Sequence, residues 1–250
     1  MDLLSRLLSL MPVSGRIDVR CHLGAPWAIA HEQAGVRDIP YHVLLSGEAV
    51  IESGEAPPLT MRAGDIVLFP RGAAHRLHDG SGKRARPIQI RETPTLTIKE
   101  NKGTGAPMDL LCGTFVVASV QDRLLRDHLP DRLVVRIGAS QPMAGSTREK
   151  PAAATTNGKA QGTRRRIASP DHDDGLRSDA DAVSAADGIV LADPAATPLA
   201  RLVELMRDEA IQERPGARAL LDYLSGALFA MTLRFASESE TPPQGLVALA

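Results

Sequence analysis

The chain has 250 residues, 43% of them apolar, which is enough material for a substantial hydrophobic core. Its 29 basic and 30 acidic residues leave a formal net charge of −1, which excludes an overall positive field for holding nucleic acid. No apolar run approaches the roughly 20 residues that cross a bilayer, so we expect no membrane partner.

Residues 2–11 predict a short amphipathic helix, because their leucines recur near the helical period. This segment carries Asp2 and Arg6 and lacks a small-residue cleavage site, which is not typical of an export signal. We therefore expect a cytoplasmic protein whose two cysteines, Cys21 and Cys112, begin as thiols.

Residues 12–137 predict a mainly β fold, because short β-type runs alternate there with Gly, Pro and Asp. Many short strands at close spacing are typical of a sandwich or barrel. The expected strands are Ile17–Leu23, Trp27–Ala30, Tyr41–Leu45, Ala49–Glu52, Leu59–Arg62, Asp65–Phe69, Ala74–His78 and Leu110–Val120. Residues 80–107 interrupt the series with basic, Gly- and Pro-rich sequence, which predicts an extended loop that could carry one edge strand around Ile88–Ile90.

Residues 138–194 predict a disordered linker, because they are rich in Ala, Gly, Thr, Ser, Asp and Arg and contain no aromatic residue. Order is expected to return over residues 195–238 as an antiparallel helical hairpin, with a flexible tail over 239–250. Thr197 and Pro198 mark the start of the first helix, and Pro215–Gly216 separates the two helices.

The hairpin carries rows of Leu and Met that exceed what one barrel face needs to bury. We therefore expect a homodimer that forms through these C-terminal helices.

The most specific motif is the string Gly64-Asp-Ile-Val-Leu-Phe-Pro70-Arg-Gly72-Ala-Ala-His75. Gly64 permits a tight turn into a strand, and Pro70 with Gly72 makes the next turn. The string resembles the second sequence motif of the cupin family. In metal-binding cupins the histidine at the position of His75 is a ligand inside the barrel, and its partners are two histidines and a glutamate from an earlier strand pair. Here the earlier motif is incomplete and retains His42.

The resemblance implies that His42 and His75 point into the barrel, and alternation places His42 on one strand face with Leu44. Together with His31 they could bind a divalent metal such as zinc, or they could be hydrogen-bonded packing. The candidate contacts for a small ligand are His42, His75 and Trp27. This chain lacks part of the ligand set that holds the metal in cupin enzymes. We therefore expect neither catalysis nor a required cofactor.

Several further segments extend the resemblance: the N-terminal helix, the stretch from Cys21 to Trp27, the strand at 110–114 and the closing hairpin. Together they resemble the N-terminal cupin half of AraC-family transcription activators, and are most similar to the reactive-chlorine-sensing regulators. The resemblance covers roughly residues 1–79, 108–137 and 195–238. It implies a cupin or jelly-roll barrel that senses an oxidant or small-molecule effector. It also implies DNA contact only through a helix-turn-helix half, which we expect to be absent from this chain.

The same resemblance places Cys21 and Cys112 at positions that the chlorine-sensing regulators use for redox signalling, and His22 beside Cys21 could lower a thiol pKa. Two cysteines on strands can equally be buried, inert core residues. The leading hypothesis is a sensor domain that responds to reactive chlorine through cysteine oxidation. The alternatives are a cupin that binds a small molecule and has inert cysteines, and a metal-dependent cupin enzyme.

Overall fold

In the computed structural model, the described residues are 3–10, 12–117, 129–137, 189–191, 197–212 and 214–238, all within one compact unit. The strands are β1 (Val13–Gly24), β2 (Ala28–His31), β3 (Asp38–Ser46), β4 (Glu48–Ser53), β5 (Ala56–Arg62), β6 (Ile66–Leu68), β7 (His75–His78), β8 (Ile88–Glu92), β9 (Thr97–Asn101), β10 (Pro107–Val117), β11 (Leu133–Ile137) and β12 (Ile189–Leu191). The helices are α1 (Leu3–Leu10), α3 (Pro198–Gln212) and α4 (Ala217–Glu238). This confirms the expected mainly β fold with a short N-terminal helix and a C-terminal helical hairpin.

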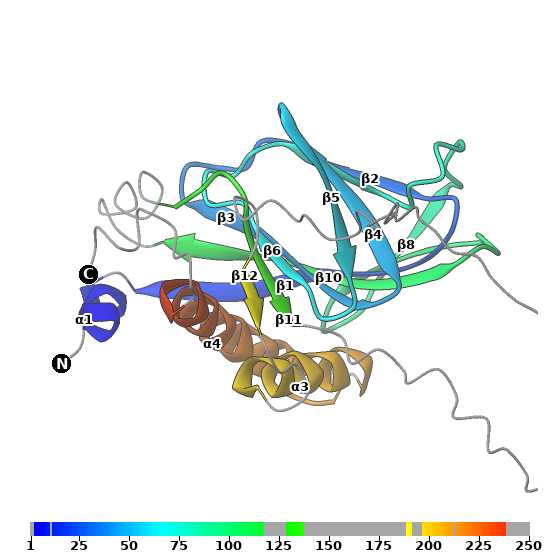
Figure 1. Cartoon of the computed structure of the whole chain (residues 1–250). Helices are drawn as coiled ribbons and strands as arrows, with labels where there is room; N and C mark the ends of the chain where they lie inside the picture. The colour runs from blue at the N-terminus through cyan, green and yellow to red at the C-terminus, as the bar shows by residue number, and fades with distance from the viewer. Residues whose placement is uncertain are drawn as a thin grey trace, which may run out of the picture. The chain divides into compact units, whose positions relative to one another are not determined.

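The strands form two sheets (Figure 1). The larger sheet has eight strands in the order β12-β11-β6-β3-β10-β1-β9-β8, and the smaller has four in the order β2-β7-β4-β5. At the centre of the larger sheet, β10 pairs antiparallel with both β3 and β1. Strands far apart in the sequence are therefore neighbours at the positions that carry the candidate site residues.

The eight-stranded sheet has a hydrophobic core on each face. Along β3, Tyr41 and Val43 belong to the core that includes α3 and α4, whereas Leu44 belongs to the core that includes the four-stranded sheet. Since successive strand side chains point to opposite faces, His42 shares the face of Leu44. We call the core toward the four-stranded sheet the inner core and the core toward the helices the outer core.

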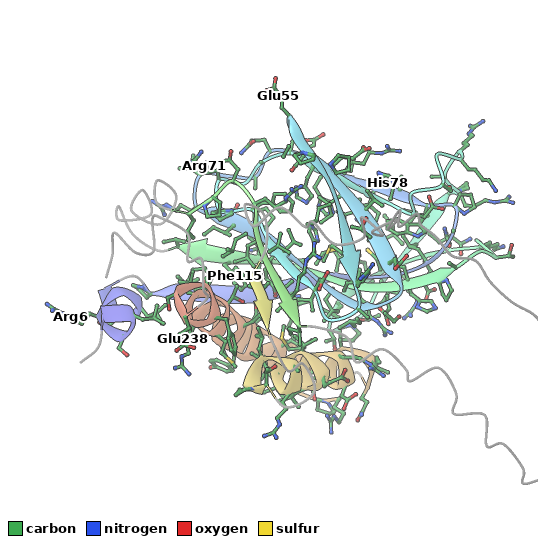
Figure 2. All side chains as sticks on the ribbon, viewed as in Figure 1. Arg6, Glu55, Arg71, His78, Phe115 and Glu238 are labelled. Atoms are coloured by element: carbon green, nitrogen blue, oxygen red, sulfur yellow. The ribbon has the colours of Figure 1, made fainter. Side chains whose placement is uncertain are left out.

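The outer core is closed by the two long helices, which lie together on one side of the strands in Figure 1. Thr197 caps helix α3, since its Oγ1 accepts a hydrogen bond from the Ala200 amide at 3.2 Å. Gly216 makes the turn between α3 and α4 with φ of 83°. Phe115 of β10, labelled in Figure 2, packs against Phe229 of α4 with ring centroids 4.9 Å apart. The hairpin therefore packs on the outside of the sheet, as expected.

Helix α4 is also long and apolar enough, by length and composition alone, to cross a membrane, the one such helix in the described part of the chain. Its side chains Leu221, Leu228, Phe229 and Leu233 are nevertheless buried in the outer core. The apolar character of α4 is therefore accounted for by its packing on the sheet.

The turns predicted around the motif of residues 64–75 are present. Gly64 has φ of 92° and Gly72 has φ of 67°, a left-handed conformation that side chains other than glycine rarely adopt. These turns bracket β6 and deliver the chain to β7, which begins at His75.

Two sequence-based predictions are wrong in part. The expected loop 80–107 contains β8 and also β9, which pairs parallel with β1 through Ile98 and Lys99, among others. Tertiary pairing with the edge of the sheet orders this stretch despite its polar composition. The expected linker 138–194 contains β12, a three-residue Ile-Val-Leu strand that pairs with β11 and is too short to show a period of two. The rest of that linker, and the tail 239–250, lie outside the described residues.

Candidate functional site

Two sheets supply the side chains of the candidate site. Within the four-stranded sheet His31 of β2 lies directly opposite His75 of β7, and within the eight-stranded sheet His42 of β3 lies directly opposite Cys112 of β10. The two pairs meet between the sheets, so residues separated by up to 81 positions converge.

The three predicted histidines are brought together. Nε2 of His42 lies 2.7 Å from Nε2 of His75, and the ring centroid of His31 is 4.8 Å from that of His42 and 4.7 Å from that of His75. Nδ1 of His75 lies 2.8 Å from the carbonyl oxygen of Ala73. Because a carbonyl can only accept, His75 carries its proton on Nδ1 and offers the Nε2 lone pair to His42.

The environment keeps these imidazoles neutral. Burial lowers the pKa of His42 well below its ordinary value, and His31 and His75 add to the effect. Burial also lowers the pKa of His75, and it lowers that of His31 to about 4 with a further contribution from the neighbouring His75. Neutral imidazoles are the form that binds metals.

Phe69 is a site residue that the sequence analysis missed as a functional neighbour. Its ring stacks on that of His75 with centroids 3.7 Å apart and an interplanar angle of 6°, and lies edge-on to His42. Phe69 precedes Pro70 in the motif of residues 64–75, so the sequence marked its position. Its contact with the His75 imidazole could not be predicted, because that contact depends on how the turn folds. Trp27, the predicted ligand contact, is buried in the same inner core.

The two cysteines also meet in this core. Cys21 is fully buried and Cys112 is 6% exposed, and the two residues are diagonal neighbours on the paired strands β1 and β10. Interaction with the Cys112 thiol lowers the pKa of Cys21 despite its burial, with a smaller contribution from Lys99. Interaction with Cys21, together with burial, raises the pKa of Cys112 well above the ordinary value. Cys21 is thus the sulfur that ionises more readily.

One cysteine touches the histidine cluster. Sγ of Cys112 lies 3.2 Å from Nδ1 of His42, on the opposite side of that ring from His75. The site is therefore one connected row in which Cys112, His42 and His75 contact one another in order, with His31 beside it and Cys21 diagonal to Cys112 on the neighbouring strand.

Comparison with known proteins identifies the family of the chain. Residues 2–160 match the cupin family Cupin_6. The chain belongs to the cupin family. The cupin fold and the resemblance inferred from the motif of residues 64–75 are thereby confirmed.

This cupin chain is similar to three curated regulators. It is 33% identical over 138 residues to the HTH-type transcriptional regulator MtrA of Neisseria gonorrhoeae, covering 55% of this chain and 45% of MtrA. It is 42% identical over 77 residues to the RCS-specific HTH-type transcriptional activator RclR of Escherichia coli K12, covering 31% of this chain and 27% of RclR. It is 28% identical over 138 residues to an uncharacterized HTH-type transcriptional regulator of Haemophilus influenzae, covering 55% of this chain and 45% of that protein. The cupin chain thus matches less than half the length of each of these relatives.

Proposed function

We propose that this cupin is the cytoplasmic sensor domain of an AraC-family transcription regulator and that it responds to reactive chlorine by oxidation of Cys21 and Cys112. The observation that carries the proposal is that Cys21 and Cys112 are diagonal neighbours on paired strands and are both buried in the inner core. Regulators of this class contact DNA through a helix-turn-helix domain, and the names of the three relatives support a role in regulation rather than in catalysis.

The chemistry of the pair suits a two-step oxidation. The Cys21 thiolate attacks hypochlorous acid to give a sulfenic acid and chloride. The Cys112 thiol then displaces the sulfenic oxygen, which leaves as water, and the two sulfurs form a disulfide. Two electrons pass in total from the sulfurs to chlorine. Because both thiols are buried, a small uncharged oxidant suits this site better than a bulky disulfide reagent does.

Strand register supplies the link between oxidation and structure. Cys21 lies opposite Leu110, and Cys112 lies opposite Val19, so the cysteines are diagonal rather than direct neighbours. Diagonal strand neighbours have Cα atoms about 7–8 Å apart, whereas a disulfide needs about 4.4–6.8 Å. Disulfide formation would therefore draw β1 and β10 together and shift their backbones.

Such a shift of the β1 and β10 backbones would displace helix α4, which packs against them. A Cβ atom at Gly15 of β1 would lie 2.3 Å from Oγ of Ser225, so the strand backbone touches the helix directly. A Cβ atom at Gly113, next to Cys112 in β10, would lie 2.4 Å from Cζ of Tyr41, and Tyr41 in turn hydrogen-bonds Ser225. Close packing of this kind transmits displacements rather than absorbing them.

The deciding experiment is hypochlorite titration of the reduced chain, followed by thiol counting and peptide mapping. We expect a reversible Cys21–Cys112 disulfide, loss of that product in Cys21→Ala and Cys112→Ala, and slow reaction with glutathione disulfide. Two thiols that stay reduced at doses that already oxidise surface methionines would leave a small-molecule sensor with inert cysteines as the remaining interpretation.

A further inference from the structure

Three metal-ligating side chains gather in the inner core. The ligand-capable atoms of His31, His42 and Cys112 all lie within 4.8 Å of one another. Two ligands on one zinc ion lie about 3.5 Å apart, because Zn–N bonds are about 2.0–2.1 Å and Zn–S bonds about 2.3 Å. An inward movement of about 1 Å would bring the three atoms onto one ion.

A second observation points independently to a ligand. Nε2 of His31 is buried and has no hydrogen-bond partner among the residues that the structure describes. Leaving a buried polar nitrogen unsatisfied costs about 1–3 kcal/mol, and such atoms in folded proteins mostly have a partner or an ion. His31 stands beside His42 and so is placed to share a ligand with it.

The hydrogen-bond row fixes which nitrogen of His42 is available. His75 donates from Nδ1 to the Ala73 carbonyl and therefore accepts at Nε2. His42, 2.7 Å away, must then donate from its own Nε2, which leaves the lone pair of its Nδ1 directed at Cys112 Sγ. A histidine that donates one ring N–H to an acceptor and presents the other nitrogen is the usual arrangement of a metal ligand.

We propose that the reduced chain binds one zinc-class divalent cation through Nε2 of His31, Nδ1 of His42 and Sγ of Cys112, the cation replacing the Cys112 thiol proton. Mixed imidazole and thiolate ligands suit a borderline-soft ion such as Zn²⁺. His75 is a positioning residue that holds the tautomer of His42. The set departs from the ligand set of metal-binding cupins, in which the histidine at the position of His75 is itself a ligand.

The inference deepens the proposed function and rests on it for its regulatory meaning, because Cys112 cannot be both a metal ligand and half of a disulfide. One hypochlorous acid molecule oxidises the Cys21 thiol and the Cys112 thiolate to the disulfide. The two sulfurs lose two electrons, chlorine leaves as chloride, and the oxygen leaves as water with the proton of Cys21. The cation loses its thiolate ligand and is released.

Binding is tested on the reduced, chelator-treated chain by titration with Co²⁺, whose complexes absorb visibly, and with Zn²⁺ against a chromophoric chelator. We expect one ion per chain and, with Co²⁺, a near-ultraviolet thiolate-to-cobalt band. Cys112→Ser should remove that band, and His31→Gln should weaken Zn²⁺ binding at least about 10-fold. The exposed His22→Gln is the matched control and should retain both signals. Circular dichroism of each variant establishes that it is folded.

The absence of saturable binding, or a thiolate band that persists in folded Cys112→Ser, would overturn the site. His75 is tested separately: His75→Ala should weaken binding about 10–100-fold with the thiolate band in place. His75→Gln, whose carbonyl oxygen can accept from His42, should restore most of the affinity. A changed cobalt spectrum in both His75 variants would make His75 a ligand and overturn its positioning role.

The link between metal binding and oxidation is tested by the release of zinc. One equivalent of hypochlorite should transfer the bound zinc to the chelator as the disulfide forms. If the chain binds zinc but hypochlorite forms no disulfide, the metal site stands and the proposed oxidant response fails. If the disulfide forms in a chain that binds no metal, the oxidant response stands and the metal site fails.

Discussion

The hydroxyl of Tyr41 lies 2.7 Å from Oγ of Ser225, in a buried hydrogen bond that joins strand β3 to helix α4. The same hydroxyl lies 3.3 Å from the carbonyl oxygen of Arg16 in β1, to which it can donate while it accepts from Ser225. One side chain thus connects the strand that carries His42, the strand that carries Cys21 and the helix that covers them.

Tyr41→Phe is expected to destabilise the fold by about 1–3 kcal/mol, because it leaves the buried Ser225 hydroxyl without its partner. Urea unfolding measures the change. Tyr223→Phe is the matched control, since Tyr223 is 80% exposed, and its effect should be close to zero. Equal effects of the two substitutions would show that the hydrogen bond contributes nothing measurable.

Gly113→Ala should destabilise the chain by about 1–3 kcal/mol or more, because the new Cβ would lie 2.3 Å from the Arg16 carbonyl oxygen and 2.4 Å from Cζ of Tyr41. Gly226→Ala in α4 meets nothing closer than the Val13 carbonyl oxygen at 4.0 Å. In a helix this replacement should stabilise by about 0.5–1 kcal/mol. Thermal unfolding of both variants should therefore give shifts of opposite sign, and a neutral Gly113→Ala would contradict the close packing of β10 on β3.

Stability of the metal-free chain should fall as the pH drops from 7 toward 4. Burial lowers the pKa of His31 from 6.5 to about 4, so between these values the unfolded chain binds a proton that the folded chain does not. His31 alone should cost about 2 kcal/mol between pH 7 and pH 5. Urea unfolding in the presence of a chelator measures this, and His31→Gln should show a shallower dependence. A stability that rises on acidification would contradict the burial of neutral imidazoles.

Self-association is expected through the helical hairpin, which carries four of the six large apolar side chains that are exposed on the described residues. These are Leu205, Ile211, Leu220 and Tyr223. Sedimentation velocity should show a dimer that Leu220→Glu together with Tyr223→Glu dissociates. Ile90→Glu replaces an apolar residue on β8 whose exposure, 64%, lies between those of Leu220 and Tyr223, and it should leave the dimer intact. A monomeric wild type, or a dimer that only Ile90→Glu disrupts, would exclude the hairpin as the interface.

Local sequence patterns predicted most of the strands and the hairpin, because these depend on period, turn residues and caps. The inward direction of His42 and His75 was implied by the resemblance to cupins. The contact between His42 and Cys112 could not be predicted, because it depends on the register of β3 against β10, which lie far apart in the sequence. Strand β9 was missed for a related reason. Its sequence, Thr-Ile-Lys-Glu-Asn, is polar, and it is ordered by parallel pairing with β1.

In the eight-stranded sheet, the site and the helices lie on opposite faces, and alternate residues of each strand point to one face or the other. In β3 and β10 the even-numbered residues His42, Leu44, Leu110 and Cys112 face the inner core, and the odd-numbered Tyr41, Val43, Leu111 and Phe115 face the helices. A sensor built on this sheet can exchange its even-numbered residues to detect another stimulus while its odd-numbered residues keep the same helices in place. The insertion of one residue in either strand would swap the two faces and abolish detection and output together.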